Sequence, residues 1–350
     1  LLKVLPFYWA SNAIDTALSS TKYRMPGMVM NTTSSIVQIV MCWVFAHPQL
    51  LNWGYLGVGL SRALGGLVSL AAAVQYVRYA GLQPYAWRRV AGAEAVLKPG
   101  AFPAYLRVSV PAALVLWSEW WAFEVTGILV GLTPKAELNL AAHGTLFNII
   151  VVVYMVWTSA CAALCALVGN LLGEGRNEEV RPLLRAAFAF SGSTSLLVAL
   201  VFELCKGWVA AGFTDDLRVQ AIIQNNSLGL VLSVPPYAQL MTFYGALRGA
   251  NYQLPGILGT FVGYWVIGLP FGALCGCIWH WPTPLLGVWL GNALALLIAS
   301  SWVLTAVFIR IDWLTVRRVE EIQQSPLLRE GCQPAAAEGV ESLQTVSTKL

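Results

Sequence analysis

Residues 140–168 read LAAHGTLFNIIVVVYMVWTSACAALCALV and contain no Asp, Glu, Lys or Arg. An α-helix rises about 1.5 Å per residue, so this run is long enough to cross the roughly 30 Å hydrocarbon core of a bilayer. A backbone surrounded by lipid must satisfy its own hydrogen bonds, which a helix does. The stretch therefore predicts a transmembrane α-helix.

Comparable apolar runs recur along the chain. Their approximate limits are 4–20, 27–46, 54–80, 108–131, 183–205, 221–247, 256–279 and 285–309. Of the 350 residues, 57% are hydrophobic and 11% are charged, whereas a soluble domain carries about 25% charged residues. The alternating pattern of a membrane β-barrel does not occur. The sequence therefore predicts an all-α membrane protein with about nine transmembrane helices.

Loop charges predict how these helices are oriented. Lys and Arg concentrate in the cytosolic loops of membrane proteins. Placing residue 350 in the cytosol puts most loop Lys and Arg on that side, among them Arg88, Arg89 and Lys98. The net charge of +4 is therefore interpreted as a sign of topology, and no nucleic-acid partner is expected.

Two pairs of segments repeat at nearly one offset. KYRMPG at 22–27 matches NYQLPG at 251–256 with an offset of 229, and LGVGLSRAL at 56–64 matches LGVWLGNAL at 286–294 with an offset of 230. The copies are six spans apart and so have the same orientation. Parallel repeats of this kind build transporters with two similar lobes around a central cleft.

The repeat also predicts the domain organisation. The second copy is preceded by more spans than the first, so about 130 residues, or three helices, are expected before residue 1 in the complete protein. Residues 1–80 are then the remnant of an N-lobe (helices 4–6), and 81–103 are a cytosolic inter-lobe linker. The C-lobe (helices 7–12) spans 104–312, and 313–350 form a cytosolic, largely disordered tail.

Three ordered motifs resemble those of the multidrug and toxic compound extrusion (MATE) family. Residues 169–176 (GNLLGEGR) resemble its hallmark turn, and 118–124 (SEWWAFE) resemble the seventh helix of its eukaryotic members. Residues 245–249 (GALRG) followed by 263–270 (GYWVIGLP) are similar to its tenth and eleventh helices. The resemblance implies a two-lobed bundle of twelve helices, of which helices four to twelve are present here.

The motifs also have local structural interpretations. Gly169, Gly173 and Gly175 are expected to end one helix, and Asn177 is expected to cap the next. Gly245 and Gly249 form a small-xxx-small pair suited to close helix packing.

Acidic residues lie well inside the predicted spans at positions 15, 119 and 124. A charge at the bilayer centre costs about 2.5–3.5 kcal/mol on insertion scales, so each should face a cavity or a partner. Glu119 and Glu124 are about 140° apart around a helix and cannot point at one spot. Hydrogen-bonded contacts between helices are the structural alternative to a binding role.

The resemblance implies that an acidic residue on the seventh helix binds a cation or a proton. Glu119 is preferred, because it is nearer the middle of its span and Trp120 can wall the same cavity; aromatic faces attract organic cations. Asp15 lies beside the acidic position expected in helix four. Helices eight and ten of relatives often carry further acidic residues, where this chain has Asn148 and Tyr237. The predicted substrate- and proton-binding residues are Glu119, Glu124, Asp15, Trp120, Tyr237 and Asn148.

We therefore expect a secondary transporter that exports organic cations or drugs in exchange for protons by alternating access. It should be a multi-pass monomer in the plasma membrane or a vacuolar or endosomal membrane, with a cytosolic C-terminus. Sodium coupling, a truncated or degenerate non-transporting copy, and a lipid or oligosaccharide flippase of the same superfamily are the alternatives. No metal-ligand cluster or nucleophile–base pair occurs in the sequence, so no enzyme activity, metal or cofactor is expected beyond the coupling ion.

Overall fold

The computed structural model describes residues 10, 13–14, 25–47, 50–79 and 101–314. All regular elements within these ranges are helices, which confirms the predicted all-α class. Most of the predicted span at 4–20, residues 81–100 of the predicted linker and most of the predicted tail lie outside the described residues. The chain divides into two compact units, Leu1–Pro99 and Gly100–Leu350, which are treated separately below.

The first unit contains the helices α2 (Met25–Ala46) and α3 (Gly54–Tyr79). They match the spans predicted at 27–46 and 54–80, and they pack against each other. The Ser34 hydroxyl donates a hydrogen bond of 2.7 Å to the carbonyl oxygen of Gly65. Large apolar side chains remain exposed on α2, including Ile39 and Trp43, as expected of a helix whose solvent is lipid.

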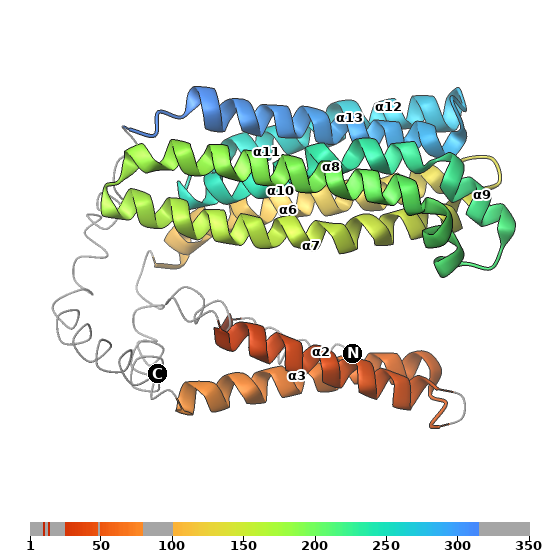
Figure 1. Cartoon of the computed structure of the whole chain (residues 1–350), viewed down its shortest axis with the longest axis horizontal. Helices are drawn as coiled ribbons and strands as arrows, with labels where there is room; N and C mark the ends of the chain where they lie inside the picture. Colours follow the sequence, from red (N-terminus) through yellow and green to blue (C-terminus); the bar gives the residue numbers. More distant parts are fainter. Residues whose placement is uncertain (1–9, 11–12, 15–24, 48–49, 80–100, 315–350) are drawn as a thin grey trace. The chain divides into compact units, whose positions relative to one another are not determined.

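The second unit is a bundle of long helices that run alongside one another (Figure 1). Two of its helices contain π-helical segments, which are local irregularities of the α-helix. The elements are α6 (Ala101–Gly131), α7 (Ala136–Glu174), the 3-10 turn η2 (Asn177–Glu179), α8 (Val180–Phe213), α9 (Leu217–Asn225), α10 (Ser227–Gly249), α11 (Leu254–Thr260), the π segment η3 (Phe261–Gly268), α12 (Leu269–Ala273), the π segment η4 (Leu274–Ile278), α13 (Pro284–Thr305) and the π segment η5 (Ala306–Arg310).

The span predicted at 221–247 begins later than expected. A separate helix, α9, ends at Asn225, and α10 begins at Ser227. Asp216 starts α9, because its carboxyl accepts a 2.9 Å hydrogen bond from the backbone N–H of Arg218. Contact with the Arg218 side chain also lowers the pKa of this exposed carboxyl. The apolar run therefore contains a helix break that its hydropathy does not reveal.

The motif at 169–176 ends α7 at a single glycine. Gly175 has φ 74°, in the left-handed region, and the backbone N–H of Arg176 donates to the carbonyl of Leu171 at 2.9 Å. This is the usual glycine C-cap geometry. Gly169 and Gly173 lie inside α7, so the prediction that all three glycines end the helix is wrong for those two.

The next helix is not capped by Asn177, contrary to the sequence prediction. Its side-chain amide instead donates to the carbonyl oxygen of Leu314 at 3.2 Å. The turn is closed by Arg176, whose guanidinium bonds Glu174 at 3.0 Å and Glu179 at 2.7 Å. All three of these side chains are about half exposed.

At the centre of the second unit lies α10, which packs against α7, α13 and α8. The contact with α7 depends on two glycines. A Cβ on Gly245 would lie 2.2 Å from the carbonyl oxygen of Cys161, and one on Gly249 would lie 2.6 Å from that of Cys165. These distances confirm the predicted small-xxx-small packing.

Six described helical segments are long and apolar enough to cross a bilayer: Met28–Ala46, Leu56–Tyr76, Ala136–Glu174, Asn177–Phe213, Leu254–Ile278 and Pro284–Arg310. Two long helices, α6 and α10, are not among them. Polar residues in lipid-embedded helices are costly and tend to mark functional sites. The less apolar helices α6 and α10 are therefore the strongest candidates to carry a binding site.

Candidate functional site

Glu119 lies on the buried face of α6. Buried residues follow it at intervals of three and four along this helix, at Ala122, Phe123, Thr126 and Val130. Its side chain is 1% exposed, and neither carboxyl oxygen has a hydrogen-bond partner in the described part of the chain. Leaving a buried polar group unpaired costs about 1–3 kcal/mol, and more if it is charged. This carboxyl therefore needs a proton, a water molecule or a positively charged partner.

Four tyrosines from three elements surround this carboxyl closely enough to interact with its charge: Tyr154 of α7, Tyr237 and Tyr244 of α10, and Tyr264 of η3. The Tyr237 hydroxyl faces Glu119 but lies outside strict hydrogen-bond geometry. The Tyr154 and Tyr237 rings stack with centroids 5.5 Å apart. Phe123 packs against Tyr237 at 6.2 Å and Tyr264 at 5.9 Å. The carboxyl is thus enclosed by aromatic rings and by hydroxyls that can both donate and accept.

A cavity of about 30 Å³ opens beside Glu119. Its lining comes from α6, α7 and α10 and consists of Leu116, Glu119, Tyr154, Thr158, Cys161, Met241, Tyr244 and Arg248. This volume can hold one or two water molecules. We refer to it as the Glu119 cavity.

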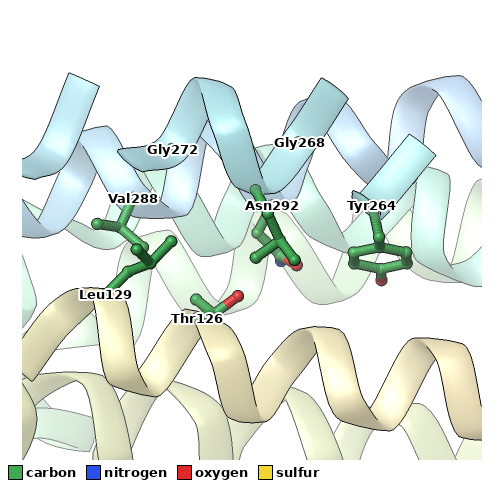
Figure 2. Close-up of a pocket in the computed structure, with 8 residues that line it drawn as sticks. Thr126, Leu129, Tyr264, Gly268, Gly272, Val288 and Asn292 are labelled. Atoms are coloured by element: carbon green, nitrogen blue, oxygen red, sulfur yellow. The ribbon is translucent and has the colours of Figure 1, made fainter. Parts of the chain in front are cut away.

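A second, narrower pocket lies further along α6 (Figure 2). Thr126 of α6 faces Asn292 of α13 and Tyr264 of η3 there. The Tyr264 hydroxyl and the Asn292 side-chain oxygen are buried without a hydrogen-bond partner among the described residues, yet the gap leaves no room for water.

The structure separates the predicted binding residues. Glu119 and Tyr237 lie together in the interior, and Trp120 packs against Tyr154 with ring centroids 6.3 Å apart. Glu124 and Asn148 are exposed on the surface of the unit and do not reach the Glu119 cavity. For Glu124 this follows from its 140° separation from Glu119 on the helix. Asn148 lies on the face of α7 opposite the buried Leu146 and Ile150. Asp15 lies outside the described residues.

Several residues near Glu119 were not singled out as binding residues from the sequence. Arg248 and Tyr264 stand inside the motifs at 245–249 and 263–270, which were interpreted only as packing and family features. Tyr237 and Tyr244 are seven residues apart, two turns on one face of α10. Tyr154 lies within the apolar run of α7, where no sequence motif marks it as a binding residue.

The comparisons with known proteins agree with this fold. Residues 111–274 match the MatE family model. The chain is 25% identical over 349 residues to "Multidrug and toxin extrusion protein 1" of Homo sapiens, covering 92% of this chain and 56% of that protein. It is also 25% identical over 313 residues to the protein of that name from Danio rerio, covering 88% of this chain and 49% of the relative. The chain thus spans about half the length of the curated relatives it matches.

Solved structures show the same architecture. The eukaryotic MATE transporter AtDTX14 superposes with a TM-score of 0.76 at 19% identity, covering 90% of this chain and 70% of that one. An outward-facing multidrug resistance MATE transporter of the MOP superfamily superposes with a TM-score of 0.71 at 16% identity, covering 87% and 66%. The resemblance predicted from the three motifs is confirmed. By sequence and by fold, this multi-pass membrane chain is similar to transporters of the MATE family.

Proposed function

We propose that this chain belongs to a secondary transporter that exports organic cations or drugs, and that Glu119 is the site where cation and proton compete. The observation that carries the proposal is the buried carboxyl of Glu119, which has no hydrogen-bond partner among the described residues and lies beside a water-sized cavity. Because the chain spans about half of its curated relatives, the activity is proposed for the whole protein.

The chemistry follows from the two states of the carboxyl. When protonated, Glu119 is neutral and tolerates its apolar surroundings; when ionised, it requires a positive partner. The faces of the surrounding tyrosine rings favour an organic cation. Each state can favour a different conformation of the bundle, which couples proton and cation movement. Protons are proposed over sodium because the cavity lining supplies a single carboxylate, whereas metal cations such as Ca²⁺ and Mg²⁺ gather several oxygen ligands.

The present conformation is too closed for a bulky substrate. A volume of about 30 Å³ admits water but not a tetraalkylammonium ion, so substrate binding requires the surrounding helices to separate. Under the orientation predicted from loop charges, the C-terminus is cytosolic. The proposal retains a monomeric transporter of the plasma membrane or a vacuolar or endosomal membrane, without catalytic activity.

Binding of radiolabelled tetraethylammonium to the purified whole protein tests the proposal. Wild-type protein should bind the ion more tightly at pH 8 than at pH 6, because protons compete for Glu119. Glu119→Gln should weaken binding at least tenfold and remove its pH dependence. Glu124→Gln is the matched control on the exposed face of the same helix; it should shift the affinity only modestly and keep the pH dependence.

The reverse pattern would contradict this assignment. If Glu119→Gln binds like wild type while Glu124→Gln does not bind, the exposed face of α6 carries the cation site.

A further inference from the structure

Arg248 lines the Glu119 cavity from the last turn of α10. Arg248 is exposed, and no hydrogen bond or ion pair holds its guanidinium among the described residues. It is nevertheless close enough for its charge to act on Glu119. The cavity therefore contains an unpaired carboxyl and an unpaired guanidinium that share one water-sized space.

Backbone packing fixes the position of Arg248. Gly245 and Gly249 flank it on α10, and both press against carbonyl oxygens of α7, those of Cys161 and Cys165. Cys161 itself lines the cavity. The turn of α10 that carries Arg248 is thus held at the cavity wall, and only the long side chain is free to move.

Arg248 is the positive group that the described elements direct toward Glu119. From α7, Tyr154 and Cys161 face the carboxyl; from α10, Tyr237, Tyr244 and Arg248; and from η3, Tyr264. The segments Leu254–Ile278 and Pro284–Thr305, which pack nearby, contain no charged residue. Of the described groups named here, Arg248 is the one whose positive charge can neutralise an ionised Glu119.

We propose that Arg248 is the resident counter-cation of the Glu119 cavity. It pairs with the carboxylate, directly or through water, once proton and substrate have left, and so competes with the incoming cation. A guanidinium is always charged, and its planar array of N–H donors matches a carboxylate. Unlike a free cation, it is covalently attached to the protein and cannot dissociate. Arg248 thereby sets the affinity and the pH range over which cations bind. The inference rests on the proposed role of Glu119.

Removing this competitor should strengthen cation binding. In Arg248→Gln, tetraethylammonium should bind the purified whole protein about tenfold more tightly at pH 9, where Glu119 is ionised in variant and wild type alike. The pH at which half of the binding is lost should rise by about one unit, since a tenfold change in affinity corresponds to one pH unit. Arg248→Lys keeps the charge at this position and should stay within about threefold of wild type.

Arg310→Gln is the matched control. Arg310 also ends a helix and is exposed, but it lies over the Trp302 ring at 5.9 Å and does not line the cavity. It should leave both the affinity and the pH profile unchanged. Thermal unfolding of every variant in detergent shows whether it is folded.

A double-mutant cycle with Glu119→Gln completes the test. The effect of Arg248→Gln should disappear in the Glu119→Gln background, because the guanidinium then has no carboxylate to neutralise. An equal effect in both backgrounds, no effect in either, or weaker binding in Arg248→Gln would overturn the inference. If Glu119→Gln alone leaves binding and its pH dependence unchanged, the proposed function fails, and that result is distinct from a failure confined to Arg248.

Discussion

The carboxyl of Glu119 is 1% exposed and unpaired among the residues the structure describes. A leucine at this position would fill a similar volume without a polar group to desolvate. Glu119→Leu should therefore stabilise the protein, by about 1–3 kcal/mol, while losing cation binding. Glu124→Leu, on the exposed face of α6, should change stability by no more than about 0.5 kcal/mol. Thermal unfolding in detergent measures both.

A lower melting temperature for Glu119→Leu would show that the carboxylate is held by stabilising contacts. The position would then be structural, and the role proposed for it would lose its physical basis.

At this scale the sequence predicts candidates but not their partners. Helix geometry separates Glu119 from Glu124, and the structure buries Glu119 and exposes Glu124. The spacing of residues along α6 does not predict that Tyr154 and Tyr264 lie close to Glu119. Both tyrosines come from other helices, and the packing of the bundle determines which helices are neighbours. Asn148 was placed in the pocket by analogy, whereas its own helix turns it outward.

The Glu119 cavity depends on the close contact between the helices α7 and α10. A methyl group at Gly245 would lie 2.2 Å from the Cys161 carbonyl oxygen, so Gly245→Ala must push the two helices apart. Overpacking of this kind costs about 1–3 kcal/mol. We expect a lower melting temperature and weaker tetraethylammonium binding, because Cys161 also lines the Glu119 cavity.

Gly173→Ala provides the control for that substitution. Gly173 is helical and exposed in α7, with nothing near the position of an added Cβ. Alanine favours a helix by roughly 0.5–1 kcal/mol over glycine, so this variant should be equally or more stable. Equal melting temperatures for Gly245→Ala and wild type would contradict the close packing of α7 and α10.

The positions of the helices were largely predictable, because long apolar runs directly indicate membrane spans. The break between α9 and α10 was not, since hydropathy does not register the side-chain hydrogen bond from Thr283 to Asn226, the residue between the two helices. The end of α7 at Gly175 was predicted, but hydropathy could not distinguish it from the helical Gly169 and Gly173. The π segments η3, η4 and η5 have no counterpart in the sequence reasoning.

The Glu119 cavity lies wholly within one of the two compact units. All of its lining residues belong to Gly100–Leu350, so cation binding can be examined without assigning a position to the first unit. The parallel repeat stays a prediction at this scale. It requires that residues 27–80 superpose on 256–309 in the same orientation, and an inverted relation in an experimental structure of the whole protein would refute it.

The central claim is that Glu119 is a buried carboxyl that binds a proton and a cation in turn. Dicyclohexylcarbodiimide, which reacts with protonated carboxyls in apolar surroundings, probes this claim without any need for transport. After treatment of the purified whole protein, peptide mass spectrometry should find the adduct at Glu119, with more of it at pH 6 than at pH 8. Excess tetraethylammonium at pH 8 should protect Glu119 and leave other carboxyls unaffected. Modification confined to Glu124, or modification of Glu119 that neither pH nor tetraethylammonium alters, would contradict the account.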